Sequence, residues 1–410
     1  MTRVVVTGIG AVTPLGLTAA QTFGALLEGH SGVAHLSFAM DPRFEVTIGA
    51  EVRNFDPSTY LARKDVRRHA RFTQLAWVAA REALADAGLA TAGYDDRKIA
   101  VILGVGLGGV ELTYEAAITL SEKGPRKISP FMLPALIPNI AAGILAIEAA
   151  AKGPCYCIAS ACASSGHAIG DAFDLIRRGV VDAAVTGGAE AALTPLGIAG
   201  FERMGALSRR NQDPQRASRP FDKDRDGFVL GEGAGILILE SLDAARRRGA
   251  TIYGEILGYG RTADAFHITH PPPDGSGARQ AMLNALQDAR IDRQRVEYIN
   301  AHGTSTRQND IAETIAIRGA LGHHADHVWV SSTKSMTGHL LGAACAVESI
   351  TTLLTLRAGV VPATINLHCP DPLCDLDYVP NSAREKHVRI AMNNAFGFGG
   401  QNVSLVFGAV

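Results

Sequence analysis

Short runs of β-branched and other apolar residues alternate with longer stretches rich in alanine and leucine along most of the chain. This alternation is typical of an α/β architecture, in which strands and helices follow one another. We predict strands at residues 4–7, 99–103, 183–186, 252–258, 298–300, 328–332 and 402–407, and helices at residues 73–87, 168–178 and 277–289, from residue 310, and from about residue 337.

Two segments repeat the same order of features. Residues 157–179 and 330–359 each run from a strand through a polar turn with a reactive residue type into a small-residue helix that ends at glycine. No low-complexity linker separates the regions that contain them. We therefore predict two similar halves packed together, residues 1–250 and 251–410.

Composition narrows the functional classes. Of the 410 residues, 47% are apolar and 19% are charged, which excludes disorder as the main state. The 39 basic side chains nearly cancel the 40 acidic ones, so no overall basic field is available to hold nucleic acid or an anionic membrane. The 44 glycines indicate many close backbone approaches.

The compartment is predicted from the start of the chain and the cysteines. Residues 1–10 pass directly into a β-branched run without the features of a secretory signal, which favours the cytoplasm. The uncharged stretch 128–147 contains three prolines, which disfavour a membrane-spanning helix. Six cysteines are few for this length, and we expect free thiols.

A glycine pattern after the second predicted strand suggests one alternative. Gly104, Gly106 and Gly109 match GxGxxG, the signature of a dinucleotide-binding turn. No acidic residue closes a following strand about 20 residues later, where the ribose partner is required. Close backbone packing is therefore the favoured interpretation.

Cys162 lies where an extended run turns through Ala, Ser and Gly into an amphipathic helix. A lone cysteine is usually a small buried apolar residue. At such an elbow, however, the positive end of the helix dipole favours the thiolate, and small neighbours leave room for a substrate. Cys155 and Cys157 are interpreted as structural, and the pair Cys369 and Cys374 is poor evidence for zinc.

Two histidines follow predicted strands. His302 ends a strand in YINAHGTST, where a functional and a structural role are equally plausible, and Asp310 is placed to cap the next helix. His339 is predicted in the first turn of a helix just after Lys334, where the dipole should keep its ring neutral. Two neutral imidazoles can each donate an N–H to one oxygen and so stabilise an enolate.

Four further residues complete this group of candidates. Lys334 and Glu348 are charges in apolar surroundings, so each needs a partner, and a structural ion pair is an equally plausible interpretation. In NNAFGFGGQN, the phenylalanines 396 and 398 lie between glycines, which can bring a backbone N–H close to a reacting carbonyl and let an aromatic side chain swing as a gate. The alternative is a turn that plugs the core.

Taken together, these motifs resemble the β-ketoacyl-[acyl-carrier-protein] synthases of the thiolase superfamily, most closely the synthase II type. The resemblance covers essentially the whole chain, from VVVTGIGAVTPLG through SACASSGHAIGDA, TGGAEAALTPLGIAGF, NAHGTST and SSTKSMTGHLLGAA to FGFGG. It implies a thiolase-like fold of five layers, αβαβα, built from two similar halves, and a homodimer.

The resemblance also implies roles for individual residues. Cys162 would take the acyl chain as a thioester, while His302 and His339 would hold the malonyl thioester during loss of CO2. Lys334 would support His339, with Glu348. The N–H groups of Cys162 and Phe398 would form an oxyanion hole. The residues implied in substrate binding are Thr304, Thr306, Leu107 and Phe396.

The implied activity is decarboxylative condensation of acyl- with malonyl-[acyl-carrier-protein] in fatty acid elongation, without a metal or cofactor of the enzyme's own. A dedicated synthase for a specialised polyketide shares this chemistry. A non-catalytic chain-length factor has the same fold but lacks the cysteine that this chain has.

The carrier protein is acidic, so a basic rim is expected on the enzyme. The candidate residues are Lys64, Arg67, Arg68, Arg126 and Lys127, although a charge run is often only a solvated face. The chain departs from the common pattern of the family at Gly205, Arg307, Gln308, Cys345 and Gln401.

Overall fold

The computed structural model describes residues 2–38 and 40–410. Ten strands form one continuous sheet in the order β10-β9-β13-β14-β8-β1-β7-β6-β4-β5. The first half contributes β1 (Val4–Val12), β4 (Ile99–Gly104), β5 (Cys155–Ile158), β6 (Ala183–Ala191) and β7 (Glu232–Ser241). The second half contributes β8 (Gly254–Ala263), β9 (Tyr298–Asn300), β10 (Trp329–Ser331), β13 (Ile390–Gly397) and β14 (Gln401–Gly408).

The sheet has the same topology on both sides of its centre. Outward from β1, the pairings with β7 and then β6 are antiparallel, and those with β4 and then β5 are parallel. Outward from β8, the pairings with β14 and then β13 are antiparallel, and those with β9 and then β10 are parallel. The two halves meet along a short antiparallel contact between Val4–Val6 and Gly254–Ile256.

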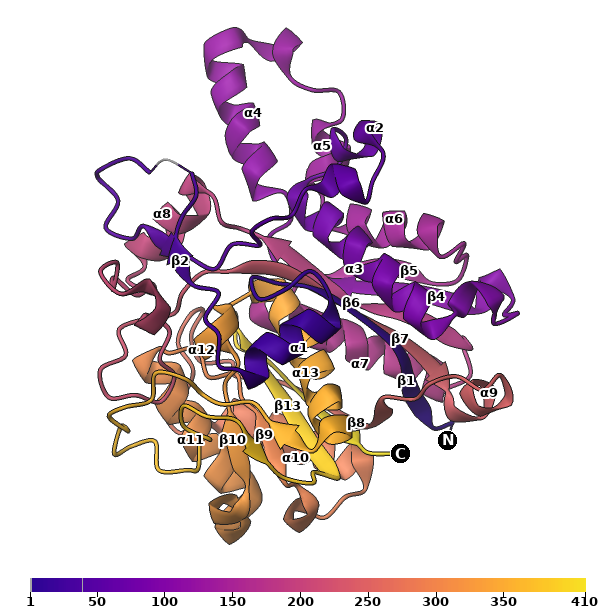
Figure 1. The fold of residues 1–410 in the computed structure, drawn as a ribbon, viewed down its shortest axis with the longest axis vertical. Helices are drawn as coiled ribbons and strands as arrows, with labels where there is room; N and C mark the ends of the chain where they lie inside the picture. Colours follow the sequence, from indigo (N-terminus) through magenta and orange to yellow (C-terminus); the bar gives the residue numbers. More distant parts are fainter. Residues whose placement is uncertain (1, 39) are drawn as a thin grey trace.

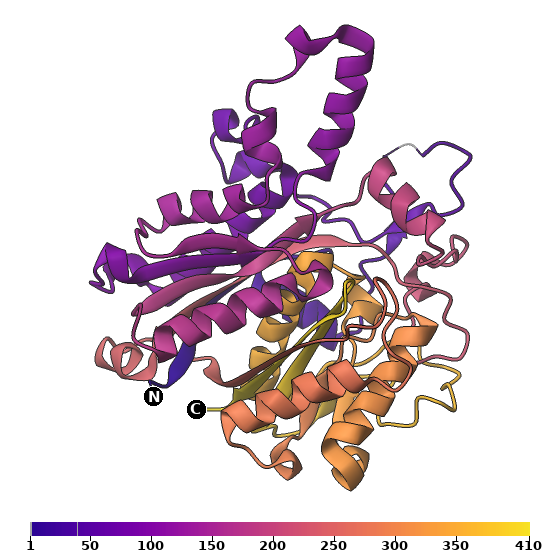
Figure 2. The same ribbon diagram turned by 180° about the vertical axis from the view of Figure 1, so that it is seen from behind.

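Helices make the other layers. Helices α3 (Arg71–Ala87) and α6 (Asn139–Glu148) cover the outside of the first half, and α10 (Ser276–Ala289) and α11 (Arg307–Leu321) cover the outside of the second. Between the halves lie α7 (Ser164–Arg177) and α13 (Ala344–Ala358), whose side chains share one core with strands of both halves (Figures 1 and 2). The result is the predicted αβαβα arrangement of two similar halves.

Glycines allow the outer helices to approach the central strands closely. A Cβ on Gly8 or Gly10 of β1 would lie 2.3 Å from the carbonyl oxygen of Ala83 or 2.0 Å from that of Ala79, both on α3. A Cβ on Gly258 or Gly260 of β8 would meet carbonyl oxygens of α10 at 2.3 and 2.0 Å. The high glycine content therefore serves the same helix-on-strand packing in both halves.

The remaining helices are shorter or lie at the periphery. They are α1 (Ala19–Leu27), α2 (Arg63–Val66), α4 (Val110–Lys123), α5 (Met132–Leu136), α8 (Pro195–Arg203), α9 (Leu242–Arg247) and α12 (Lys334–Thr337). The 3₁₀ turns are η1 (Pro57–Thr59), η2 (Leu89–Thr91), η3 (Asp96–Lys98), η4 (Pro125–Lys127), η5 (Ala161–Ala163), η6 (Pro214–Arg216), η7 (Arg293–Arg295), η8 (Gly322–His327) and η9 (Leu341–Ala343). Two small ladders pair β2 (Ala34–His35) with β3 (Ile48–Gly49), and β11 (Val360–Val361) with β12 (Arg384–Glu385).

Several predicted elements differ from the structure. The helix expected from about residue 337 is wrong, because α12 ends at Thr337 and α13 begins only at Ala344. Strands β7 and β13 were not predicted: β7 contains three glycine or alanine residues before its apolar run, and β13 contains two buried asparagines. The strands β1 to β7 precede residue 250 and β8 to β14 follow it. The division of the chain into domains at residues 1–250 and 251–410 stays a prediction.

One helical segment, Leu341–Ala358, is long and apolar enough to cross a membrane. In the structure 83% of it is buried, because it includes α13 at the centre of the molecule. The segment is therefore apolar because both halves of the protein pack against it.

Candidate active site

Cys162 lies at the apex of a sharp turn between β5 and α7. The turn η5 spans Ala161–Ala163, and Ala161 has a φ of +50°, in the left-handed region that residues other than glycine rarely occupy. The elbow presents the cysteine to a cavity of about 600 Å³. The side chain is buried, with 7% of its surface exposed.

His339 lies beside the cysteine, although 177 residues separate them in the chain. Its Nε2 is 3.0 Å from Cys162 Sγ. The backbone N–H of Leu341 donates to His339 Nδ1 at 3.3 Å, which assigns the proton of the neutral ring to Nε2. The ring therefore points an N–H at the sulfur and at any oxygen that binds there.

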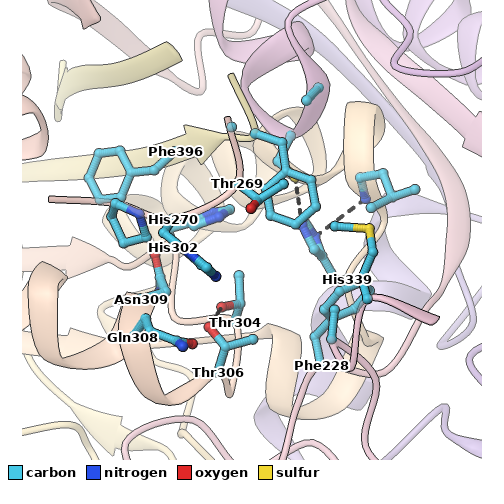
Figure 3. A pocket seen from close by; sticks show the side chains of 18 of the residues that line it. Phe228, Thr269, His270, His302, Thr304, Thr306, Gln308, Asn309, His339 and Phe396 are labelled. Carbon is cyan, nitrogen blue, oxygen red and sulfur yellow. Dashed lines mark hydrogen bonds between the residues drawn. The ribbon is translucent and has the colours of Figure 1, made fainter. Parts of the chain in front are cut away.

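His302 faces the same space from the end of β9. Its ring centroid lies 5.4 Å from that of His339 and 5.6 Å from that of Phe396, in edge-on contacts. Its backbone N–H and that of Gly303 donate to the buried Glu313 carboxylate at 2.8 and 2.7 Å. The two rings, labelled in Figure 3, converge on one region of the cavity.

Burial controls the charge state of this group. It raises the pKa of the Cys162 thiol to about 12, although Lys334 and the backbone N–H of Phe398 act in the opposite direction. The raised pKa disagrees with the resting thiolate expected at this elbow, because loss of solvation is the largest effect on the thiol. Burial and then the Lys334 charge lower the pKa of both His302 and His339.

The neutral state expected for His339 thus has a different cause from the one predicted. The residue lies in the turn between α12 and η9, before α13 begins, and not in the first turn of a helix. Its backbone N–H donates to the Val229 carbonyl at 2.8 Å, and the ring of Phe228 packs edge-on against it at 5.4 Å between centroids. Packing and burial therefore hold the ring.

Lys334 and Glu348 form the ion pair that their apolar surroundings require. The Lys334 ammonium hydrogen-bonds to Glu348 Oε1, and both side chains are almost fully buried. Burial raises the pKa of Glu348, and the ammonium opposes that rise. Because α12 and α13 each contribute one partner, the pair also joins these two helices.

Asp310 differs from its predicted position as a helix cap. The N-cap of α11 is Thr306, and Asp310 lies within the first turn. Its carboxylate accepts the N–H of Phe221 at 2.9 Å and pairs with the buried Arg225 at 3.2 Å. It therefore anchors the start of α11 to a separate loop.

The turn between β13 and β14 lies above the nucleophile elbow. The backbone N–H groups of Phe398 and of Cys162 itself act to lower the pKa of the Cys162 thiol. The side chain of Phe398 is half-buried and lines the cavity. A hydrogen bond of 2.7 Å from the Gly399 N–H to the Ile268 carbonyl ties this turn to the neighbouring loop.

The predicted substrate-binding residues all line the same cavity. Thr304 and Thr306 hydrogen-bond to each other at 2.9 Å, and Leu107 is 46% exposed. The lining also contains four of the departures from the common family pattern. The cavity residues in question are Leu107, Gly205, Thr304, Thr306, Arg307, Gln308, Phe396 and Gln401.

Cys345, the fifth departure, is buried away from the cavity. Its sulfur accepts a hydrogen bond from Asn393 at 3.4 Å, and a Cβ on Gly166 of α7 would lie 2.9 Å from it. It fills the contact between α7 and α13, and a substrate cannot reach it because it is fully buried.

Several cavity residues were missed in the sequence. Glu190 lines the cavity, and its side chain is fully buried. Glu313 lies behind the cavity and accepts the backbone N–H of His302. For Glu190 a signal was present, since it is the only charge in the apolar run AVTGGAEAALTP. The other missed lining residues include Phe228, His267, Thr269, His270 and Asn309 (Figure 3).

The glycine motif after β4 holds an internal carboxylate. The N–H groups of Gly106 and Leu107 donate to Glu190 at 2.8 and 3.1 Å. A Cβ on Gly104 would lie 2.1 Å from the Ser165 nitrogen. Close backbone packing, the favoured interpretation, is confirmed.

The site residues themselves include potential metal ligands. Within residues 2–38 and 40–410, one group of potential donors clusters, namely Cys162, His302 and His339, with donor atoms within 4.8 Å of one another. The nearby Lys334 charge and the proton on His339 Nε2 oppose a cation there. Buried oxygens of Asn300, Glu348 and Asn393 have no hydrogen-bond partner in the described structure and are donors of the kind that hard cations prefer.

Comparisons with known proteins agree with this geometry. The family model described as "Beta-ketoacyl synthase, N-terminal domain" matches residues 1–245, and "Beta-ketoacyl synthase, C-terminal domain" matches residues 253–368. The chain belongs to the β-ketoacyl synthase family. A relative from Synechocystis sp., named 3-oxoacyl-[acyl-carrier-protein] synthase 2, is 50% identical over 99% of this chain and 97% of its own.

Two solved structures share the fold of this β-ketoacyl synthase. A ketosynthase solved with its type II polyketide acyl-carrier protein is 36% identical, with a TM-score of 0.94, and the match covers 100% of this chain and 99% of that one. A β-ketoacyl synthase from Burkholderia phymatum is 36% identical, with a TM-score of 0.92, and the match covers 100% of both chains. The family and its thiolase-like fold are thus shown over the full length.

Proposed function

We propose that this enzyme condenses acyl-[acyl-carrier-protein] with malonyl-[acyl-carrier-protein], releasing CO2 and forming 3-oxoacyl-[acyl-carrier-protein] in fatty acid elongation. The observation that carries the proposal is the convergence of Cys162 Sγ with the rings of His339 and His302 in one cavity. Relatives about half identical over their full length, named 3-oxoacyl-[acyl-carrier-protein] synthase 2, favour fatty acid elongation over a specialised polyketide.

The first half-reaction is acyl transfer to Cys162. The sulfur attacks the thioester carbonyl, a new C–S bond forms, and the carrier thiol leaves with the proton that Cys162 loses. The N–H groups of Cys162 and Phe398, which both act on the thiol, stabilise the oxyanion of the tetrahedral intermediate. Thr304 and Thr306 bind the arm that carries the thioester.

The second half-reaction generates the carbon nucleophile. The neutral rings of His302 and His339 donate N–H groups to the malonyl thioester oxygen, where negative charge develops as CO2 leaves. The enolate carbon then attacks the acyl-cysteine carbonyl, the C–S bond breaks, and the released Cys162 thiolate takes up a proton from solvent. The electron pair of the new C–C bond comes from the bond to CO2 that breaks, so the steps require no redox cofactor.

Lys334 has an electrostatic role in this scheme. Its charge lowers the pKa of both histidines. It also lowers the pKa of the Cys162 thiol and so stabilises the thiolate that forms during attack. Glu348 balances the ammonium and keeps it in the apolar core. The pair therefore preserves neutral imidazoles without leaving an isolated buried charge.

Acyl carrier protein is the proposed partner. Lys64, Arg67 and Arg68 lie at the surface on and beside α2, and Arg126 and Lys127 lie in η4. Arg68 stacks over Phe131 at 4.7 Å, which connects the two segments. None of the five basic side chains forms an ion pair within the described residues, so they are available to an acidic protein.

Replacement of Lys64, Arg67 and Arg68 by Glu tests this surface. We expect a rise in the Michaelis constant for the acyl-carrier-protein substrate and little change for a small acyl thioester. Arg246→Glu with Arg247→Glu on α9, at a distant exposed site, is the matched control. Equal effects on both substrates would place the docking surface elsewhere.

We further propose a cytoplasmic homodimer. The edge strand β5 exposes Tyr156, and the projecting α4–α5 region in Figure 1 exposes large apolar side chains. These include Phe131, Leu133, Ile137 and, on α6, Ile147, which is 78% exposed. Exposed apolar surface of this kind is typical of an interface, and sedimentation analysis of the purified chain tests the dimer.

The decisive experiment is intact mass spectrometry after incubation with acyl-[acyl-carrier-protein]. The proposal predicts an acyl adduct that Cys162→Ala abolishes and that the exposed-site control Cys369→Ser leaves unchanged. An enzyme that forms no adduct under turnover conditions would instead support a non-catalytic partner of a ketosynthase.

A further inference from the structure

The side-chain carboxylate of Glu190 accepts several backbone hydrogen bonds, in addition to the pairing of its own backbone in a strand. It lies near the end of β6, beyond the point where Gly188 pairs with Gly104 at the end of β4. The loop that follows β4 passes over its carboxylate, and three successive N–H groups donate to it. The bonds come from Gly106 at 2.8 Å, Leu107 at 3.1 Å and Gly108 at 3.3 Å.

Successive backbone N–H groups that converge on one point form an anion-binding nest. In this chain the nest encloses a carboxylate of the protein itself. A Cβ on Gly106 would lie 2.5 Å from Glu190 Oε2, so the glycine is required for the approach. Burial raises the pKa of Glu190 to about 7, and the N–H donors oppose that rise.

The same carboxylate reaches the other half of the molecule. Gly342 in η9 donates its N–H to Glu190 Oε2 at 3.2 Å. Its neighbour Leu341 orients the His339 ring through Nδ1. Glu190 therefore connects the loop that carries Leu107 to the turn that follows His339, and both Leu107 and Leu341 line the cavity.

We propose that Glu190 is a specificity-determining positioning residue, whose carboxylate holds Leu107 in place as a limit to the acyl part of the cavity. The inference rests on the proposed function and on Leu107 lining the acyl pocket. Without the carboxylate, the loop at residues 106–108 loses the acceptor of three N–H groups and moves. The enzyme then accepts longer acyl chains.

Loading of Cys162 with acyl-carrier-protein donors of graded chain length tests the proposal. In Glu190→Ala we expect the ratio of kcat/KM for long donors to that for short donors to rise about tenfold, the scale of a pocket changed by one or two methylene groups. Leu107→Ala should shift the ratio in the same direction, and the double variant should add little. Glu190→Gln, which preserves volume, replaces Glu190→Ala if the latter does not fold.

Formate provides a second measurement, because a small carboxylate can occupy the vacant nest. It should return the ratio of Glu190→Ala toward that of the native enzyme and leave Leu107→Ala unchanged. Glu313→Gln is the matched control, since Glu313 is also a buried acceptor of backbone N–H groups but makes no bond to the Leu107 loop. It should not shift the ratio.

The outcomes separate this inference from the proposed function. Loading of a short donor tests the chemistry of Cys162 alone. A native enzyme that does not load a short donor would therefore overturn the proposed function. An equal fall for all donor lengths in Glu190→Ala, additive effects in the double variant, or a ratio that formate does not restore would overturn the role of Glu190.

Discussion

The elbow before α7 and the elbow before α13 have nearly the same backbone but carry different chemistry. Ala161 and Leu341 have φ values of +50° and +48°, and each begins a 3₁₀ turn of three residues that leads directly into a helix. The second residue of the turn is Cys162 in the first half and Gly342 in the second. The first supplies a side chain to the cavity, and the second supplies a backbone N–H to Glu190.

The two halves also differ before the elbow. In the first half, residues 159–160 connect β5 to η5, whereas in the second half residues 332–340 connect β10 to η9. The longer connection contains α12 with Lys334, and then His339. The first elbow therefore positions Cys162. The connection before the second elbow carries Lys334 and His339, which lie close to Cys162 and affect its environment.

Breaking the ion pair of the longer connection should have the largest effect on stability. We expect Lys334→Met to lower the free energy of unfolding by about 3–5 kcal/mol, because it leaves Glu348 buried and unpaired. The double variant Lys334→Met with Glu348→Gln should recover much of the loss. Denaturant unfolding measures both, and a double variant as unstable as the single one would contradict the explanation.

Removal of either histidine should separate the two half-reactions. We expect His302→Ala and His339→Ala to lower malonyl decarboxylation by about 10²–10³-fold, the cost of losing one donor to a developing oxyanion. Acyl loading of Cys162 should be retained, because the oxyanion donors proposed for that step are the backbone N–H groups of Cys162 and Phe398. Release of CO2 and intact mass report the two steps, and equal losses in both would refute the assignment.

The second elbow should not tolerate a side chain at its apex. A Cβ on Gly342 would lie 2.5 Å from the Gly106 nitrogen and 2.8 Å from Glu190 Oε2. We expect Gly342→Ala to destabilise the protein by about 1–3 kcal/mol through overpacking. Gly143→Ala on α6, where a Cβ would meet nothing within 4 Å, is the control and should be neutral or stabilising by about 0.4–1 kcal/mol.

A further effect concerns pH. Burial raises the pKa of Glu190 to about 7, above its ordinary value of 4.5, so the folded state retains a proton that the unfolded state releases. Stability attributable to this group should therefore fall as pH rises from about 4.5 to about 7, by at most about 1.4 kcal/mol per pH unit. Glu190→Gln should remove this slope relative to the native enzyme, as measured by unfolding at pH 5 and pH 7. Parallel pH profiles for the two proteins would show that Glu190 does not titrate in this range.

The sequence determined the fold class and the chemical groups of this protein. The alternation of strands and helices, the repeated elbow and the residue types at 162, 302, 334 and 339 are all local patterns, and each is visible along the chain. Neighbouring residues also identified the elbow at Cys162, since small residues at a strand-to-helix turn are a local property.

The charge states of those groups depend on how the chain folds. The protonated thiol and the cause of the neutral rings follow from burial by residues far away in the chain, and a local dipole argument therefore mispredicted the thiol. The sequence also did not predict the hydrogen bonds of Glu190, because its partners lie in the loop after β4 and in η9, more than 80 residues away on either side. Solvation and long-range hydrogen bonds depend on what the fold brings together, and spacing along a chain does not specify them.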